Sequence, residues 1–224
     1  MNKSDKSALR TLEGTQYQRF FGQFGTKPHY EDVDGCLYFY GGEFSNFVGG
    51  PYTLGNPHYT GYSPDINRWS DYRTVEHWYQ ACKATNSHDH ELIRRTTDTW
   101  EAKAIGQEIE LRDDWEIAKL HVMLNGLRIK FNDSEFWHPL LETENLYLAE
   151  DSPTDFVWGI RDENGGYTGR NLLGVALMLI RDKTNGRTDA HERAIATVMA
   201  RNDKHSETDR AMLIFDQKMT SEQD

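Results

Sequence analysis

The nine-residue segment from Leu172 to Ile180 has no charged or hydrogen-bonding side chain, and this limits the possible folds of the chain more than any other feature. A helix that is apolar on every side is stable in water only when it is buried. Nine residues are also far fewer than the roughly 20 that a helix needs to span a bilayer. The segment therefore predicts a central helix over residues 171–184 of a globular domain.

Residues 113–131 predict a second buried helix. Two neighbouring stripes of apolar side chains follow it at helical spacing: Leu120, Met123 or Leu124, Leu127 and Phe131 on one, and Trp115, Ala118, Val122 and Ile129 on the other. So wide an apolar face belongs at the centre of the molecule.

The remaining elements are shorter. The pattern of apolar residues predicts helices at residues 74–85, 88–95, 99–108 and 133–143, and strands at residues 36–40 and 146–148. Residues 49–71 contain several glycines and prolines, which indicate a long loop or a hairpin with an irregular tip. The predicted fold class is α+β and mainly α-helical, with a small β-sheet or hairpin beside a helical core.

The chain of 224 residues is long enough for one well-filled core, and no linker-like stretch divides it. We expect a polar N-terminal extension over residues 1–35, with one short helix near residues 15–22. A single domain should follow over residues 36–184. Residues 185–224 should form a helical extension that packs on the same domain, with disorder at residues 220–224.

Composition narrows the classes of function. A formal net charge of −11 argues against strong nonspecific binding to nucleic acid, which requires clustered lysines and arginines. The two cysteines, Cys36 and Cys82, have no metal-binding spacing, so we expect neither a metal nor another cofactor. The polar N-terminus does not resemble a signal peptide, and we expect a cytoplasmic protein that does not enter a membrane.

The segment from Thr74 to Lys83 places one acid, Glu76, at the start of an aromatic helix. On that helix Glu76, Gln80 and Lys83 share one face. Thr74 suits a helix cap, and the unpaired amides of the first turn favour a carboxylate and tend to keep it ionised. Because such a glutamate is also typical of a solvated helix end, only its surroundings can identify Glu76 as a catalytic residue.

Two loop segments supply possible surroundings. Phe44-Ser45-Asn46-Phe47 would bury two rings and leave Asn46 for a turn or for a ligand hydrogen bond. A glycine-rich run at residues 165–169 leads through Arg170 and Asn171 into the central helix, an arrangement that suits a phosphate bound by backbone amides. Arg170 is either a phosphate partner or a solvated surface residue.

Six blocks of residues occur in an order that resembles the YbiA-like family, also called NADAR for its link to NAD and ADP-ribose. The blocks are Phe39-Tyr40; Phe44-Ser45-Asn46-Phe47; Glu76-His77 with Gln80-Ala81 and Lys83; Leu111-Arg112 with Trp115; Lys130-Phe131; and Trp158-Gly159 with Asn171, Leu173-Gly174 and Leu177-Met178. The resemblance runs from about residue 36 to about residue 181.

The resemblance implies a YbiA-like fold and an N-glycosidase, a hydrolase that cleaves the bond between C1 of a ribose and nitrogen. It assigns Glu76 as the catalytic glutamate and Trp115 and Trp158 as pocket residues, although core packing explains Trp115 equally well. A fixed carboxylate suits the oxocarbenium-like transition state of such a reaction. The other expected substrate-binding residues are Tyr40, Phe44, Asn46, Phe47, Gln80, Gly159, Arg170 and Asn171.

One position separates two branches of the family. Members that cleave riboflavin-pathway ribosylamino intermediates carry an aspartate directly after the Trp-Gly pair, where this chain has Ile160. This difference favours the branch that removes ADP-ribose from guanine, on a nucleotide, DNA or RNA, with an ADP-ribosyltransferase toxin as its functional counterpart. The alternatives are riboflavin-type activity and a non-catalytic module that binds ADP-ribose or NAD.

The group that protonates the leaving nitrogen stays open at this stage. The candidates are Asp162, Glu163, His77 and bulk water. His77 is also well explained as a hydrogen-bonded core histidine.

Overall fold

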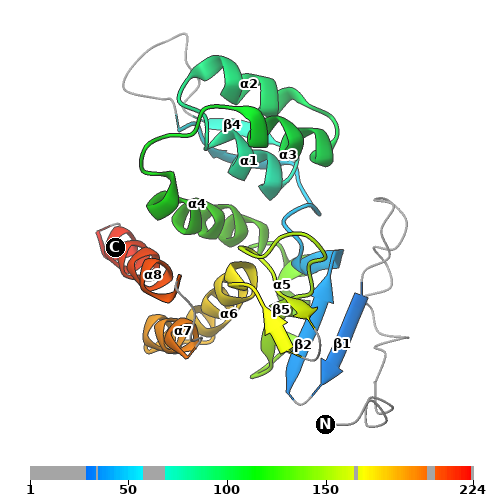
Figure 1. Cartoon of the computed structure of the whole chain (residues 1–224), viewed down its shortest axis with the longest axis vertical. Helices are drawn as coiled ribbons and strands as arrows, with labels where there is room; N and C mark the ends of the chain where they lie inside the picture. Colours follow the sequence, from blue (N-terminus) through cyan, green and yellow to red (C-terminus); the bar gives the residue numbers. More distant parts are fainter. Residues whose placement is uncertain (1–28, 34, 58–68, 164–165, 201–204, 223–224) are drawn as a thin grey trace.

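The computed structural model describes residues 29–33, 35–57, 69–163, 166–200 and 205–222 (Figure 1). The α-helices are α1 (Val75–Ala81), α2 (Ser87–Arg95), α3 (Thr99–Glu108), α4 (Trp115–Lys130), α5 (Ser134–Glu142), α6 (Leu172–Thr184), α7 (Ala190–Met199) and α8 (Ser206–Ser221). The strands are β1 (His29–Val33), β2 (Cys36–Tyr40), β3 (Tyr52–Gly55), β4 (Trp69–Tyr72), β5 (Tyr147–Glu150), β6 (Arg161–Glu163) and β7 (Gly166–Thr168). The α+β, mainly helical fold class is confirmed.

Helices α4 and α6 form the centre of the hydrophobic core, as their apolar patterns predict. Leu173 and Leu177 of α6 are buried together with Leu120 and Leu124 of α4. The prediction is wrong for Ile129, which is 40% exposed on the outer side of α4. Within the described ranges, no helix is both long and apolar enough to cross a membrane.

Two glycines allow helix α1 to approach its neighbours closely. A Cβ atom on Gly126 of α4 would lie 2.8 Å from Val75 Cγ1, and one on Gly106 of α3 would lie 2.0 Å from Gln80 Oε1. Neither position has room for a larger side chain. Helix α1 is thereby held between α3 and α4, with its polar face toward α3.

The main sheet has three strands. Strand β2 lies at its centre, antiparallel to β1 and parallel to β5, with Phe39 opposite Glu150. The predicted strand at residues 36–40 is confirmed, and the strand expected at 146–148 occupies residues 147–150. Strand β1 of this sheet consists of residues that the sequence predicts to belong to the polar N-terminal extension, residues 1–35.

Two hairpins complete the β-structure. Strands β3 and β4 pair within the segment expected to be a loop or hairpin, while the tip at residues 58–68 lies outside the described part of the chain. The glycine-rich run forms part of a second hairpin, β6–β7, instead of a continuous loop. Asn171, with a φ of 54°, then turns the chain into α6.

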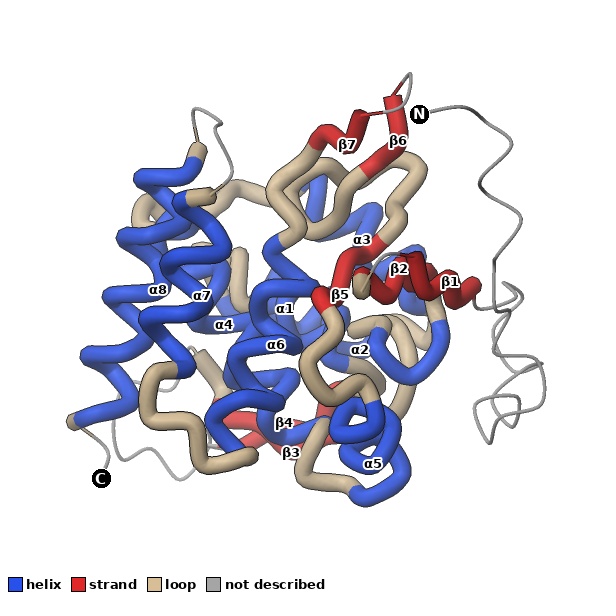
Figure 2. The backbone as a smooth tube through the Cα atoms, turned by 90° about the horizontal axis from the view of Figure 1, so that it is seen from below, coloured by secondary structure: helices blue, strands red, loops and turns tan. Residues whose placement is uncertain are grey.

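The C-terminal helices pack on the body of the protein. Helix α8 contacts α4 and α7, and α7 contacts α6. Figure 2 shows these two helices on one flank of the core and the main sheet on the opposite flank. Helix α8 continues to Ser221, so residues 220 and 221 are helical within the tail expected to be disordered; residues 223–224 and the helix predicted near 15–22 lie outside the described ranges.

Candidate active site

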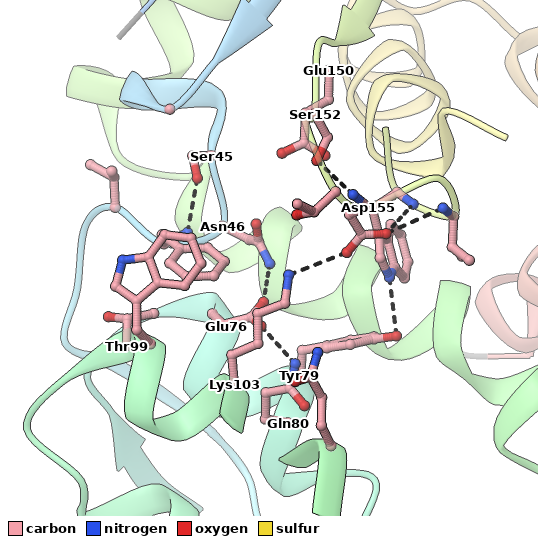
Figure 3. Close-up of a pocket in the computed structure, with 18 of the residues that line it drawn as sticks. Ser45, Asn46, Glu76, Tyr79, Gln80, Thr99, Lys103, Glu150, Ser152 and Asp155 are labelled. Carbon is pink, nitrogen blue, oxygen red and sulfur yellow. Dashed lines mark hydrogen bonds and ion pairs between the residues drawn. The ribbon is translucent and has the colours of Figure 1, made fainter. Parts of the chain in front are cut away.

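A cavity of about 510 Å³ lies beside helix α1 (Figure 3). Its wall is built from segments far apart in the sequence: the loop around Asn46, helices α1, α3 and α4, and the stretch from the end of β5 to Trp158. The central position of α1, between α3 and α4, brings these segments together.

Glu76 is fixed at the base of this cavity. Thr74 caps α1 by accepting a hydrogen bond from the His77 N–H. The Glu76 N–H donates to the Asn46 carbonyl at 2.9 Å, and the Asn46 side-chain amide donates back to Glu76 Oε2. The Gln80 amide donates to Glu76 Oε1 at 2.6 Å. Each oxygen of the carboxyl group therefore has an amide donor, and the side chain is only 3% exposed.

The surroundings of Glu76 act on its pKa in opposite directions. Burial raises the pKa, because the charged form loses its hydration. The hydrogen bond from Gln80 and the charges of Lys103 and Lys83 oppose that rise. We expected the first-turn position to keep Glu76 ionised, but the net shift of its pKa is upward. The ionised form therefore depends on the Gln80 amide and on the two lysines.

Three aromatic side chains form one wall of the cavity. The Tyr79 ring lies 5.0 Å from the Trp115 ring and 5.2 Å from the Trp158 ring, measured between centroids. The Trp158 Nε1–H donates to the Tyr79 hydroxyl at 3.2 Å. Trp115 and Trp158 thus line the cavity and also belong to the hydrophobic core.

Three lysines supply positive charge around the cavity. Lys103 pairs with Asp155 at 3.2 Å, and Lys119 pairs with Glu116 at 2.6 Å. Lys83 donates to the Gly106 carbonyl at 3.3 Å and lies over the Tyr79 ring. A cavity with several ammonium groups is suited to a ligand that carries phosphates.

Among the described residues, four acids that were not selected from the sequence also line the cavity: Asp98, Glu116, Glu150 and Asp155. Glu150 ends strand β5, and Asp155 follows in the next loop. The Asp155 carboxylate accepts the N–H groups of Val157 and Trp158 and so holds the turn before Gly159. The sequence signals for Glu150 and Asp155 are an acid two residues after a predicted strand and an aspartate three residues before the Trp-Gly pair.

The rim of the cavity carries a second aromatic pair. The rings of Phe47 and Trp100 lie 4.9 Å apart, and Trp100 is 54% exposed. Phe47 and Tyr40 were selected from the sequence and do line the cavity, whereas Trp100 was not selected. This pair offers a flat apolar surface at the entrance.

Several of the residues predicted to bind substrate have other roles here. Phe44 is buried against Phe39. Arg170 is buried and its guanidinium donates to Asp209 of α8, so it is not the free phosphate partner that we considered. The Asn171 side chain donates to the Leu148 carbonyl and accepts the Glu150 N–H, which ties α6 to β5.

Gly159 and His77, two further residues selected from the sequence, are not among the residues that line the cavity. A Cβ atom on Gly159 would lie 2.6 Å from Ser152 Cβ, so this glycine permits close packing. His77 is fully buried with Nδ1 2.9 Å from Thr74 Oγ1, and burial lowers its pKa. Asp162 and Glu163 lie in β6, and their side chains are outside the described part of the structure.

No group of three or more potential metal ligands occurs among the residues that the structure describes. Ile160, which replaces the aspartate of the riboflavin-intermediate branch, is buried, and its N–H donates to the Glu150 carbonyl at 2.7 Å.

Comparison with known proteins gives a consistent result. The family model of the NADAR domain matches residues 38–185. The chain is 34% identical over 145 residues to N-glycosidase YbiA of Shigella flexneri serotype 5b, across 63% of this chain and 81% of that protein. It is 32% identical over 162 residues to the chloroplastic riboflavin biosynthesis protein PYRR of Zea mays, across 66% of this chain but 24% of that protein.

A solved structure supports the same relationship. The NMR structure of the E. coli protein YbiA superposes with a TM-score of 0.54 at 30% identity, covering 75% of this chain and 91% of that one. The resemblance read from the six sequence blocks is confirmed. The chain therefore belongs to the NADAR domain family and is an N-glycosidase.

Proposed function

We propose that this enzyme removes ADP-ribose from ADP-ribosylated guanine, with Glu76 acting beside the ribose whose C1–nitrogen bond is cleaved. The observation that carries the proposal is the Glu76 carboxyl group, buried in the cavity and oriented by Asn46 and Gln80. No metal or other cofactor is part of the proposal.

The chemistry follows from the position of that carboxyl group. As the C1–nitrogen bond lengthens, positive charge develops on the ribose ring, and an adjacent carboxylate stabilises it. The two amide donors fix the carboxylate, so little reorganisation is needed when the charge appears. The same carboxylate can orient the attacking water or accept its proton.

The cavity suits a nucleoside diphosphate sugar. Its volume of about 510 Å³ lies within the range of roughly 300–1,000 Å³ that is typical of small-molecule sites. Lys83, Lys103 and Lys119 are cationic side chains of the lining, and a bound diphosphate would replace Asp155 and Glu116 as the partners of Lys103 and Lys119. At the rim, Phe47 and Trp100 provide a surface on which a base can stack.

Two alternatives have specific support. Similarity to the maize riboflavin protein favours a ribosylaminopyrimidine phosphate as substrate, but Ile160 removes the carboxylate expected there. A non-catalytic ADP-ribose-binding module would use the same lysines and aromatics. Glu76 argues against that module, because a buried carboxylate repels a polyanionic ligand.

The test is to incubate the enzyme with a guanine-ADP-ribosylated oligonucleotide and, separately, with a ribosylaminopyrimidine phosphate, and to follow the products by mass spectrometry. The proposal predicts release of ADP-ribose from the first substrate only. Release of ribose phosphate from the second alone would favour the riboflavin-type activity. Bound but uncleaved ADP-ribose would favour the binding module.

The proposal also implies a source for the substrate. A transferase that attaches ADP-ribose to guanine, such as an ADP-ribosyltransferase toxin, would supply the substrate. We propose that the hydrolase reverses this modification in the cytoplasm.

A further inference from the structure

Glu150 lines the same cavity as Glu76, and the reaction described above gives it no role (Figure 3). Its backbone is held from both sides. The Glu150 N–H donates to Asn171 Oδ1 at 3.0 Å, and its carbonyl accepts the Ile160 N–H at 2.7 Å and the Ser152 N–H at 3.0 Å. The end of β5 is thus a rigid support for a side chain that faces the cavity.

The hydrogen bonds of the cavity leave the Glu150 carboxyl group available. In the part of the chain that the structure describes, five acidic residues line the cavity: Glu76, Asp98, Glu116, Glu150 and Asp155. Glu76 accepts two amides, Asp98 accepts the Glu101 N–H as the cap of α3, Glu116 binds Lys119, and Asp155 binds Lys103 and two backbone N–H groups. Among the described residues, none donates a hydrogen bond to the Glu150 carboxyl group.

The carboxyl groups of Glu76 and Glu150 also differ in their charge environment. Burial raises the pKa of Glu150 to about 8, the negative charges of Asp155 and Glu76 raise it as well, and Lys103 opposes them. Burial raises the pKa of Glu76 as well, but there the Gln80 amide and the charges of Lys103 and Lys83 oppose the rise. A protonated acid and an ionised carboxylate in one site is the division of roles that acid–base catalysis needs.

We propose that Glu150 is the general acid that protonates the leaving nitrogen, an inference that rests on the proposed function. The electron pair of the C1–nitrogen bond passes to nitrogen, which takes the proton of Glu150 and leaves as neutral guanine. Water forms the new C1–oxygen bond and gives one proton to the Glu76 carboxylate. Solvent then returns that proton to Glu150, so the sum is substrate plus water giving guanine and ADP-ribose.

The experiment compares the pH dependence of kcat/KM for the full-length parent and the Glu150→Gln variant on the guanine-ADP-ribosylated oligonucleotide. The parent should lose activity as the pH rises through about 8, where Glu150 loses its proton. The variant should be slower by about 100- to 10,000-fold and should lack this alkaline decline. Glu108→Gln, an exposed acid on α3 outside the cavity, is the matched control and should behave like the parent.

If the Glu150→Gln substitution perturbs the fold, a second variant keeps the test decisive. Glu150→Ala should regain part of its rate when acetate is added, since a small acid can occupy the space of the side chain. A merely structural role predicts no rescue and an unchanged alkaline decline, and either result would overturn the assignment. If the parent itself releases no ADP-ribose, the proposed function fails instead, so the two failures are distinguishable.

Discussion

Individual carboxyl groups in this cavity have different nearest neighbours, and these act on their pKa values in different ways. Glu76 accepts hydrogen bonds from Asn46 and Gln80, whereas none of the described residues donates one to the Glu150 carboxyl group. Hydrogen bonds to the charged form lower a carboxyl pKa, and burial without such donors raises it. The proposed mechanism depends on this difference.

Replacing Trp100 tests the role of the rim. Stacking of a base on an aromatic side chain contributes about 1–3 kcal/mol, so Trp100→Ala should raise KM for the oligonucleotide substrate by roughly 5- to 150-fold with little change in kcat. Steady-state kinetics provide the measurement. Trp69→Ala, which removes an equally exposed tryptophan from β4, should change neither parameter.

Lys130 gives a prediction for stability. It is fully buried, donates to the Ser45 carbonyl at 2.7 Å and lies over the Phe136 ring. Burial lowers its pKa to about 7, while the nearby Glu43 opposes that shift. In the unfolded chain the pKa of a lysine is about 10.4, so between pH 7 and 10 the unfolded state binds more protons and stability rises with pH.

The Lys130→Met variant should lose this pH dependence. From pH 7 to 9.5 the free energy of unfolding of the parent, relative to the variant, should rise by on the order of 3 kcal/mol. Urea denaturation at several pH values measures the difference. Lys183→Met, at an exposed lysine of α6, should keep the slope of the parent; equal slopes for Lys130→Met and the parent would refute the prediction.

Local sequence identified some site residues and missed others for physical reasons. Glu76 and Gln80 lie four residues apart on one helix, so their contact was predictable. Arg170 was misjudged because its partner, Asp209, is 39 residues away on a helix whose docking the sequence does not specify. The same holds for Glu150, which enters the cavity only through the pairing of β5 with β2.

At the scale of elements, helix α8 is attached to the body through a buried charge. Asp216 lies 3.1 Å from His121 Nδ1 and 3.2 Å from His191 Nε2, and it accepts Arg128 Nη2 at 2.9 Å. Burial alone would raise the pKa of Asp216, but these hydrogen bonds and the arginine charge lower it below its ordinary value. Asp216 thus connects α8 to both α4 and α7.

Asp216→Asn should therefore destabilise the protein. Removing one partner of a buried ion pair costs about 3–5 kcal/mol, and because Arg128 is partly exposed we expect about 2–3 kcal/mol at pH 7. Urea denaturation measures this loss. Since the folded-state pKa is lowered, the difference should be complete above the ordinary pKa of aspartate and shrink as the pH falls below it.

The exposed Glu207 of the same helix is the control for Asp216, and Glu207→Gln should leave stability nearly unchanged. A similar loss in both variants would mean that the helix itself, and not the buried cluster, is sensitive to substitution.

Most elements were predictable because their apolar residues follow a regular spacing. The helices at residues 88–95, 99–108 and 133–143 lie within one residue of α2, α3 and α5 at each end. The hairpin of β6 and β7 was not predicted, since glycines allow many conformations and pairing depends on the register of strands. The exposure of Ile129 depends likewise on which side of α4 its neighbours cover.

At the scale of the whole molecule, the net charge of −11 limits how nucleic acid can bind. The three lysines that line the cavity can contact only a ligand bound there, and we propose that the enzyme recognises the modified nucleotide alone. An unmodified oligonucleotide should bind at 150 mM salt more weakly than roughly 10⁻⁴ M, the weak end of nonspecific binding. Tight binding that weakens steeply with added salt, measured by fluorescence anisotropy, would contradict this account.

The proposed role of the Glu76 carboxyl group is tested by single-turnover cleavage of a guanine-ADP-ribosylated oligonucleotide by the parent and by Glu76→Gln. Glutamine keeps the size of the side chain but removes the charge that stabilises the oxocarbenium-like state. We predict release of ADP-ribose by the parent, a rate lower by several orders of magnitude in the variant, and an unchanged fold by circular dichroism. A variant that is correctly folded and cleaves at nearly the parental rate would contradict the account.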